Sequence, residues 1–405
     1  MQAPRPAVQY QHLQSQIDAL LAGGYTYSAP ASGDHRQAVL MADLTGDGRE
    51  EAIVFLRGES ENLLTVFLPG DGEFTALPPV VENAESVHSV VFCDLSGDGK
   101  QEIAVGWQAG ALRMLSVYAL ESGGLTELFT RRFSAYIVYD IEEEGTPALL
   151  IVQVDSAEQV VEMVSAANGE LAVTGTAHLS RGAEAVKRIR AGPLLDRRPG
   201  LLVTSQYQTS AGEITDVLTF RDGGLVNISA NMETGVSDGL VRQREIFATD
   251  VNGDGVLNLP HPVELPGYPG DEEVFYEIRW TAYDSSGLSA ETARTYHNVG
   301  NNWYILLPEQ WPGPYTVRRA QGPAQTVTTF SDLSGDVPAD FLRIYYITQP
   351  AGNRPPVRGR VVLAEQDNLF VLAEIVPPED GRQIIHETEL KEHLFRLIPP
   401  DWRGP

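Results

Sequence analysis

The sequence has little of three things that mark common classes of protein. Cys93 is its only cysteine, so no disulfide can form within the chain. No apolar run approaches the roughly 20 residues that a membrane-spanning helix needs. Basic residues are scarce, with 29 Lys and Arg against 55 Asp and Glu, and the net charge of −26 repels phosphate backbones and anionic lipid surfaces. We therefore expect no transmembrane segment and no nucleic-acid partner.

Motifs of familiar enzyme classes are missing as well. None of the eight histidines forms a His-Glu-x-x-His zinc pattern, and no Gly-x-Ser-x-Gly elbow, phosphate loop or dinucleotide fingerprint occurs. Cys93 ends the apolar run 90–93, where a small buried hydrophobic residue fits better than a catalytic thiol. We predict no catalytic residue, although an active site assembled from scattered residues stays possible.

One nine-residue pattern, by contrast, occurs three times. It starts at Asp43, Asp94 and Asp250 and reads Asp-x-(Thr/Ser/Asn)-Gly-Asp-Gly, followed by an oxygen-bearing side chain at position 9. The glycine at position 6 allows a sharp turn that directs the side-chain oxygens at positions 1, 3, 5 and 9 towards one point. This spacing is typical of a calcium-binding loop.

A helix–loop–helix calcium site begins in the same way but does not fit here. That site needs a bidentate Glu at position 12 and a helix on each side. Position 12 is Val54, Val105 and His261 in the three copies. The flanking runs 37–42 and 51–56 are rich in β-branched and apolar residues, so we expect the loop to join two strands.

The three copies resemble the FG-GAP/VCBS-type repeat, an integrin-α-like calcium-loop repeat. In this repeat the loop links the first two strands of a β-propeller blade. The resemblance covers roughly residues 31–300 and implies a fold and a metal, but no activity. It also implies an extracellular or cell-surface location, as in uncharacterised secreted or lipid-anchored bacterial proteins. We accordingly expect that a signal or lipid anchor was removed ahead of the given sequence.

The resemblance further implies two to three Ca²⁺ ions. We number the loops by their place in a series of five repeats: loop one starts at Asp43, loop two at Asp94 and loop five at Asp250. Loop five carries one formal charge fewer than loops one and two, so we expect it to bind calcium more weakly. The expected side-chain ligands are Asp43, Thr45, Asp47 and Glu51 in loop one, Asp94, Ser96, Asp98 and Glu102 in loop two, and Asp250, Asn252, Asp254 and Asn258 in loop five. The carbonyls of Arg49, Lys100 and Val256 are expected to complete the shells.

Two further repeats have lost ligands. Residues 140–148 keep acids at Asp140, Glu142 and Glu144 but end in alanine, so metal binding there stays open. Residues 192–200 keep only Asp196, beside two arginines that would repel a cation, and we expect no metal in this loop.

Hairpin-forming turns recur along the chain at the same spacing as the loops. The five repeats start at residues 43, 94, 140, 192 and 250, and a hairpin-forming turn should follow each start by about 28 residues. We predict a mainly β protein whose residues 31–300 form a five-bladed β-propeller, closed by pairing of residues 25–28 with the fifth blade. The expected turns are 70–72, 122–124, 168–169, 222–223 and, after an insertion, 285–287.

The two ends of the chain lie outside this repeat. Residues 1–30 are expected to form a helix over 7–21 and a lead-in strand. Residues 301–405 are expected to form a small α+β domain with its own core and a terminal helix over 387–397. The proline-rich insertion 259–270 suits either a recognition loop or a stiff connector, and residues 332–340 suit a hairpin loop better than a sixth calcium loop.

These observations favour a calcium-stabilised extracellular binding or scaffold module without catalytic activity. The alternative is a propeller enzyme that acts on polysaccharide or another extracellular substrate at the mouth of the central channel. We expect a monomer whose partner is an unknown protein or glycan ligand.

Overall fold

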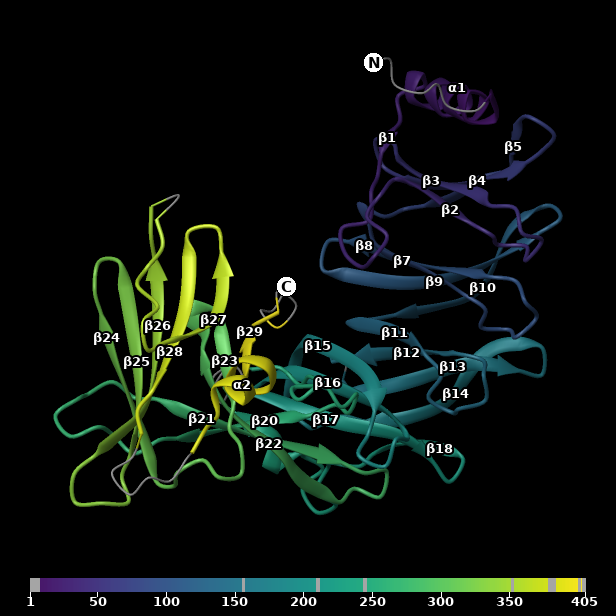
Figure 1. Cartoon of the computed structure of the whole chain (residues 1–405). Helices are drawn as coiled ribbons and strands as arrows, with labels where there is room; N and C mark the ends of the chain where they lie inside the picture. The colour runs from purple at the N-terminus through teal and green to yellow at the C-terminus, as the bar shows by residue number, and fades with distance from the viewer. Residues whose placement is uncertain are drawn as a thin grey trace. The chain divides into compact units, whose positions relative to one another are not determined.

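The computed structural model describes residues 8–154, 157–208, 212–242, 246–350, 353–377, 384–399 and 402. These residues form six antiparallel sheets of four to six strands, so the mainly β class is confirmed (Figure 1). None of the described helices is long and apolar enough to cross a membrane. The chain divides into two compact units. Unit 1 comprises 1–191, 199–210 and 214–238, and unit 2 comprises 192–198, 211–213 and 239–405.

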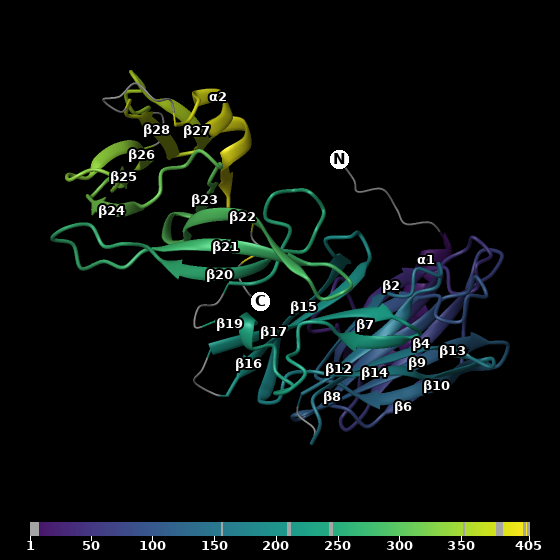
Figure 2. The same ribbon diagram turned by 90° about the horizontal axis from the view of Figure 1, so that it is seen from below.

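Unit 1 holds four consecutive sheets, which lie one after another in a row (Figures 1 and 2). Each neighbouring pair of sheets shares an apolar core, for example Phe55 with Trp107, Val117 with Leu149, and Leu150 with Leu201. The strands are β1 Thr26–Tyr27, β2 Val39–Ala42, β3 Glu51–Arg57, β4 Asn62–Pro69, β5 Phe74–Ala76 and β6 Val80–Glu82; β7 Ser86–Cys93, β8 Glu102–Ala109, β9 Leu112–Glu121 and β10 Gly124–Arg132; β11 Ala135–Tyr139, β12 Ala148–Gln153, β13 Val160–Ala167 and β14 Glu170–His178; β15 Ala183–Pro193, β16 Pro199–Tyr207, β17 Gly212–Arg221 and β18 Gly224–Asn227.

The repeat predicted from sequence is visible in the connections. In each of these four sheets the repeat loop joins the first two strands of the repeat, as β2 to β3 and β7 to β8. All five predicted turns also join neighbouring antiparallel strands, from 70–72 between β4 and β5 to 285–287 between β21 and β22. Local turn chemistry therefore identified the strand order correctly.

The N-terminal helix is present as α1 Val8–Ala22. Leu13 and Ile17 are buried against Val54 and Phe67 of the first sheet. The predicted closing contact is wrong, because β1 pairs with β3 of the first sheet and not with the fifth repeat. Strand β2 pairs only with the first four residues of β3, which leaves the end of β3 available to β1.

Unit 2 contains two five-stranded sheets. Part of the proline-rich insertion is a strand and not a loop, since β20 pairs with β21 along its whole length. It lies at the sheet edge, where its two prolines cost no ladder hydrogen bond. The strands are β20 Leu259–Glu264, β21 Tyr276–Tyr283, β22 Ser289–Asn298, β23 Trp303–Leu306 and β29 Phe395–Leu397; and β24 Tyr315–Gln321, β25 Gln325–Asp332, β26 Ala339–Thr348, β27 Val361–Gln366 and β28 Leu369–Ile375. The short β19 Val241–Arg242 precedes them.

The apolar core of residues 301–405 is shared with residues that precede them. A single apolar cluster combines Phe275 and Tyr296, which precede that boundary, with Trp303, Phe330 and Phe341, which follow it. Residues 303–306 moreover continue the sheet of β22. The fifth repeat and the tail therefore stabilise each other, and the boundary at residue 301 stays a prediction.

Two smaller predictions about the tail also have outcomes. Residues 333–338 join β25 to β26, so the calcium-like stretch 332–340 is a hairpin loop as expected. The terminal helix is shorter than predicted, with α2 Glu387–Glu389 followed by one π-helical turn, Leu390–Leu394. It ends there because Phe395 pairs with Ile305 in the sheet.

Candidate calcium loops

The first aspartate organises each of the three complete loops. Asp43 Oδ1 accepts hydrogen bonds from the amides of Gly46 and Asp47 at 2.8 and 3.2 Å, and its Oδ2 accepts one from Gly48 at 2.9 Å. Asp94 makes the same three bonds at 2.6, 3.2 and 2.9 Å, and Asp250 makes them at 2.8, 3.1 and 2.8 Å. The three loops thus share one geometry.

Positions 5 and 9 complete this hydrogen-bond network. Asp47 Oδ1 accepts the amide of Arg49 at 2.8 Å, and the buried Glu51 accepts the amide of Leu44 at 2.8 Å. In loops two and five, Asp98, Glu102, Asp254 and Asn258 make the equivalent bonds at 2.9, 2.7, 2.7 and 3.0 Å. These side chains therefore have a structural role that needs no metal, as in a tight turn whose carboxylates accept hydrogen bonds from backbone amides.

The glycines at positions 4 and 6 are required by the backbone. Gly46 and Gly48 have φ of 72° and 83°, in the left-handed region that favours glycine. A Cβ on Gly46 would lie 2.5 Å from the carbonyl oxygen of Gly99, so no side chain fits there. Loops one and two are consequently in contact, and the amide of Gln101 donates to the carbonyl of Leu44 at 3.0 Å.

Position 3 behaves differently from the others. The hydroxyl oxygen of Thr45 is buried and has no hydrogen-bond partner among the described residues. Burial raises the pKa of Glu51 despite its amide hydrogen bonds, and the carboxylates of Asp47 and Asp43 push it in the same direction. Carboxylates that repel one another beside an unpaired hydroxyl form an oxygen set that a hard divalent cation fits.

In loops two and five, position 3 has a partner. Ser96 approaches Asp94 Oδ1 at 3.5 Å, and Asn252 contacts both the amide and the side chain of Asp254. The unpaired hydroxyl therefore distinguishes loop one.

The two degenerate loops have diverged in different ways. In loop three, Asp140 still accepts the amides of Glu144 and Gly145 at 3.1 and 2.9 Å, but Ala148 cannot replace the acceptor at position 9. Position 4 is Glu143, which takes a left-handed φ of 61° that disfavours a side chain. Burial raises the pKa of Glu142, and Glu144 and Asp140 add to the effect.

Loop four forms hydrogen bonds with residues of the fifth repeat. Asp196 accepts hydrogen bonds from the amide and hydroxyl of Ser285 at 3.2 and 2.6 Å. The guanidinium of Arg197 donates to the carbonyl of Asp254, inside loop five, at 2.8 Å. The sequence suggested repulsion of a cation from loop four, but it did not show that Arg197 lies beside loop five.

The ligand set as a whole stays a prediction. Within the part of the chain that the structure describes, no three His, Cys, Asp or Glu side chains converge closely enough to define a metal centre. The position-9 side chains of loops one and two face inward and are buried, whereas Asp47 and Asp98 are exposed.

Comparison with known proteins supports the repeat. Residues 43–105 match the model of the FG-GAP-like repeat, so the resemblance inferred from loops one and two is confirmed there. No curated protein sequence matches the chain.

Similar solved structures include proteins of different kinds. A protein from Lactobacillus plantarum is 9% identical over 79% of this chain and 95% of its own, with a TM-score of 0.31. The rhamnogalacturonan lyase YesW is 16% identical over 74% and 70%, with a TM-score of 0.33. The V. cholerae biofilm matrix protein Bap1 is 14% identical over 85% and 57%, with a TM-score of 0.30.

Proposed function

We propose that this chain is a calcium-stabilised extracellular binding or scaffold module without catalytic activity of its own. The observation that carries the proposal is the shared loop geometry, in which oxygen-bearing side chains at positions 1, 5 and 9 are held in place by backbone amides. The buried, unpaired hydroxyl of Thr45 supports it, because such a group needs a partner. A bound ion would supply that partner and reduce repulsion among the loop carboxylates.

The finer features of the fold belong to the same proposal. We infer five propeller-type repeats between residues 31 and 300, each with its loop between first and second strands. The ions would stabilise shape and would take no part in a reaction. The proposal also includes a monomeric state and an exterior location, where calcium is abundant.

Thr45→Val separates a metal site from a simple turn. Valine keeps the shape of threonine but removes a hydroxyl that has no partner in the described part of the chain, so the melting temperature in chelator should be unchanged or slightly higher. Calcium at a hundredfold excess over its dissociation constant stabilises a fold by roughly 2.7 kcal/mol per site, and the variant should lose part of this gain.

The matched comparison is Asp47→Ala combined with Asp98→Ala. This variant loses two amide hydrogen bonds as well as two ligands, so its melting temperature should fall even in chelator. Wild-type protein that shows the same melting temperature with calcium and with chelator would refute the metal and leave the loops as hydrogen-bonded turns.

A further inference from the structure

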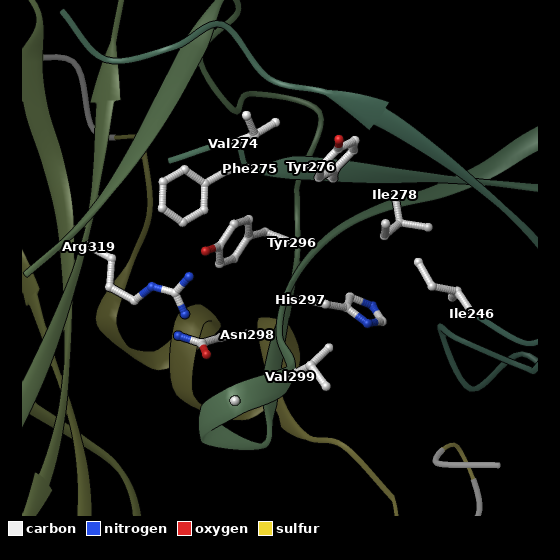
Figure 3. Close-up of a pocket in the computed structure, with 11 residues that line it drawn as sticks. Ile246, Val274, Phe275, Tyr276, Ile278, Tyr296, His297, Asn298, Val299 and Arg319 are labelled. Carbon is white, nitrogen blue, oxygen red and sulfur yellow. The ribbon is translucent and has the colours of Figure 1, made fainter. Parts of the chain in front are cut away.

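Unit 2 contains a cavity of about 270 Å³ that is unrelated to the calcium loops (Figure 3). Most of its lining residues are aromatic or aliphatic, and Phe275, Tyr296 and Ile278 are buried there, while polar and apolar atoms share the cavity surface about equally. Val274 and Val299 are half or more exposed at its edge, with exposed fractions of 50% and 64%. Small-molecule sites in proteins are typically concave, mostly apolar and supplied with a few polar groups, and this volume is slightly below the usual range for drug-sized ligands.

Two of the lining side chains carry buried nitrogen atoms without a partner among the described residues. They are Nε2 of His297 and Nε of Arg319. Figure 3 shows the hydroxyl of Tyr296 and the guanidinium of Arg319 pointing towards each other, with His297 on the opposite side near Ile246. Buried polar groups in native proteins are normally paired, so these two nitrogens have hydrogen-bonding capacity that the described residues do not use.

Two of the lining side chains are held in place by their neighbours. Asn298 accepts the amide of Asn301 at 3.1 Å and donates to Thr328 at 3.2 Å. The ring of His297 stacks on Trp402, with an interplanar angle of 17°, and contacts Tyr304 at a centroid distance of 5.2 Å. A ligand would therefore find the cavity preformed, which lowers the entropic cost of binding.

The charges decide what kind of ligand fits. Arg319 forms an ion pair with Glu273, and its guanidinium lies 5.4 Å from the ring centre of Phe275. An acidic ligand at Arg319 would be repelled by Glu273, and a cation would be repelled by Arg319. Burial lowers the pKa of His297 to about 4, so this side chain adds no charge near neutral pH.

We propose that this cavity binds a neutral, hydroxylated ring of the size of one sugar residue. Such a ring offers an apolar face to the aromatic walls and hydroxyl groups to His297 and Arg319. The neutral imidazole can donate or accept at Nε2, depending on its tautomer, and a hydroxyl group can do either in return. This inference deepens the proposed function, on which it rests, by naming the ligand class of the binding module.

His297→Phe tests the proposal on the full chain. Phenylalanine keeps the stacking on Trp402 but removes the unpaired nitrogen, so the variant should fold normally. Saturation-transfer NMR and calorimetry in saturating calcium would use the methyl glycosides of glucose, galactose, mannose and N-acetylglucosamine as probes. We expect at least one to bind the wild type, and binding to weaken about tenfold in the variant, the effect of losing one ligand hydrogen bond.

Two controls sharpen the test. His178→Phe makes the same change on an exposed strand of unit 1 and should leave binding unchanged. Arg319→Lys keeps the charge beside Glu273 but removes the Nε–H donor, so it should weaken binding as well. The methyl glycosides of glucuronic and galacturonic acid should bind more weakly than their neutral counterparts.

Either of two results would overturn the proposal. One is wild-type protein that binds no neutral glycoside or prefers the acidic ones. The other is His297→Phe binding as tightly as the wild type. The calcium-dependent melting temperature is measured on the same samples, so a failed calcium proposal would be recognised separately.

Discussion

At the scale of single residues, the calcium-loop pattern serves two purposes that the sequence alone does not separate. Asp43 and Glu51 hold the loop through backbone amides and are also predicted metal ligands. Thr45 is the only loop-one position whose side-chain oxygen is buried without a partner among the described residues. The pattern of oxygen-bearing residues is therefore already explained by the hydrogen bonds that hold the loop. Metal binding has to be tested at Thr45, whose side chain takes no part in these hydrogen bonds.

Glu143 is expected to cost stability because its φ of 61° suits glycine, which occupies this position in loops one, two and five. We predict that Glu143→Gly raises the free energy of unfolding by about 1 kcal/mol, measured by urea denaturation. Asn168→Gly is the matched control. Asn168 has a φ of 53°, but asparagine tolerates this region, so the gain there should be smaller. Equal gains, or a loss at residue 143, would contradict the prediction.

His297 should make folding depend on pH. Its pKa is lowered from 6.5 to about 4 by burial, so between these values the unfolded chain binds a proton that the folded chain does not. The contribution of His297 to the free energy of unfolding is therefore fully present above pH 6.5 and is lost as the pH falls towards 4. The loss amounts to about 3 kcal/mol at most, at 1.36 kcal/mol per pKa unit.

His297→Phe isolates this contribution from that of the many carboxylates. The difference in unfolding free energy between variant and wild type should grow in favour of the variant as the pH is lowered from 7 to 4. A difference that stays constant over this range would show that His297 is not protonated preferentially in the unfolded state.

At the scale of elements, loops four and five act together. The guanidinium of Arg197 contacts the backbone of loop five, and a positive charge near a cation site opposes binding. We predict that Arg197→Gln increases the calcium affinity of loop five roughly three- to fivefold, because nearby charges in a mostly aqueous setting repel each other by about 1 kcal/mol or slightly less. Isothermal titration calorimetry in a background of Asp47→Ala and Asp98→Ala would measure loop five alone.

Arg198→Gln provides the control for net charge. It removes the same charge from the neighbouring residue. An equal effect of both substitutions would mean that general electrostatics, and not the contact with Asp254, sets the affinity.

The elements that could be predicted were those with local signals. Turns such as 168–169 and the calcium-like loops depend on glycine and aspartate at fixed positions, so sequence placed them correctly. The strand β20 was missed because Pro260 and Pro262 resemble loop residues, and only an edge position tolerates them. The cavity around His297 could not be predicted at all, because its residues come from separate segments between 246 and 319 and share no motif.

At the scale of the whole chain, the two units differ in how their cores are built. In unit 1, three apolar clusters each join two consecutive sheets, as expected for repeats that contact their neighbours. In unit 2, the largest cluster extends from Leu265 to Phe395 and includes residues of both of its sheets. Stability in unit 1 should therefore be spread over the repeats, whereas unit 2 should unfold as one block.

A chain that ends at Gly300 would test this view of unit 2. Truncation there removes Trp303 and Phe330, which are both fully buried against Tyr296, and leaves Tyr296 and its neighbour Phe275 without this cover. Loss of a buried aromatic side chain typically costs 3–5 kcal/mol, so losing several exceeds the usual stability of a domain. We expect residues 239–300 of this chain to lack a cooperative unfolding transition by near-UV circular dichroism.

A second chain ending at Asp238 should keep the transition of unit 1, since the clusters of that unit lie within its residues. If the chain ending at Gly300 instead shows the transitions of both units in saturating calcium, the domain boundary near residue 301 is correct and the shared cluster is dispensable.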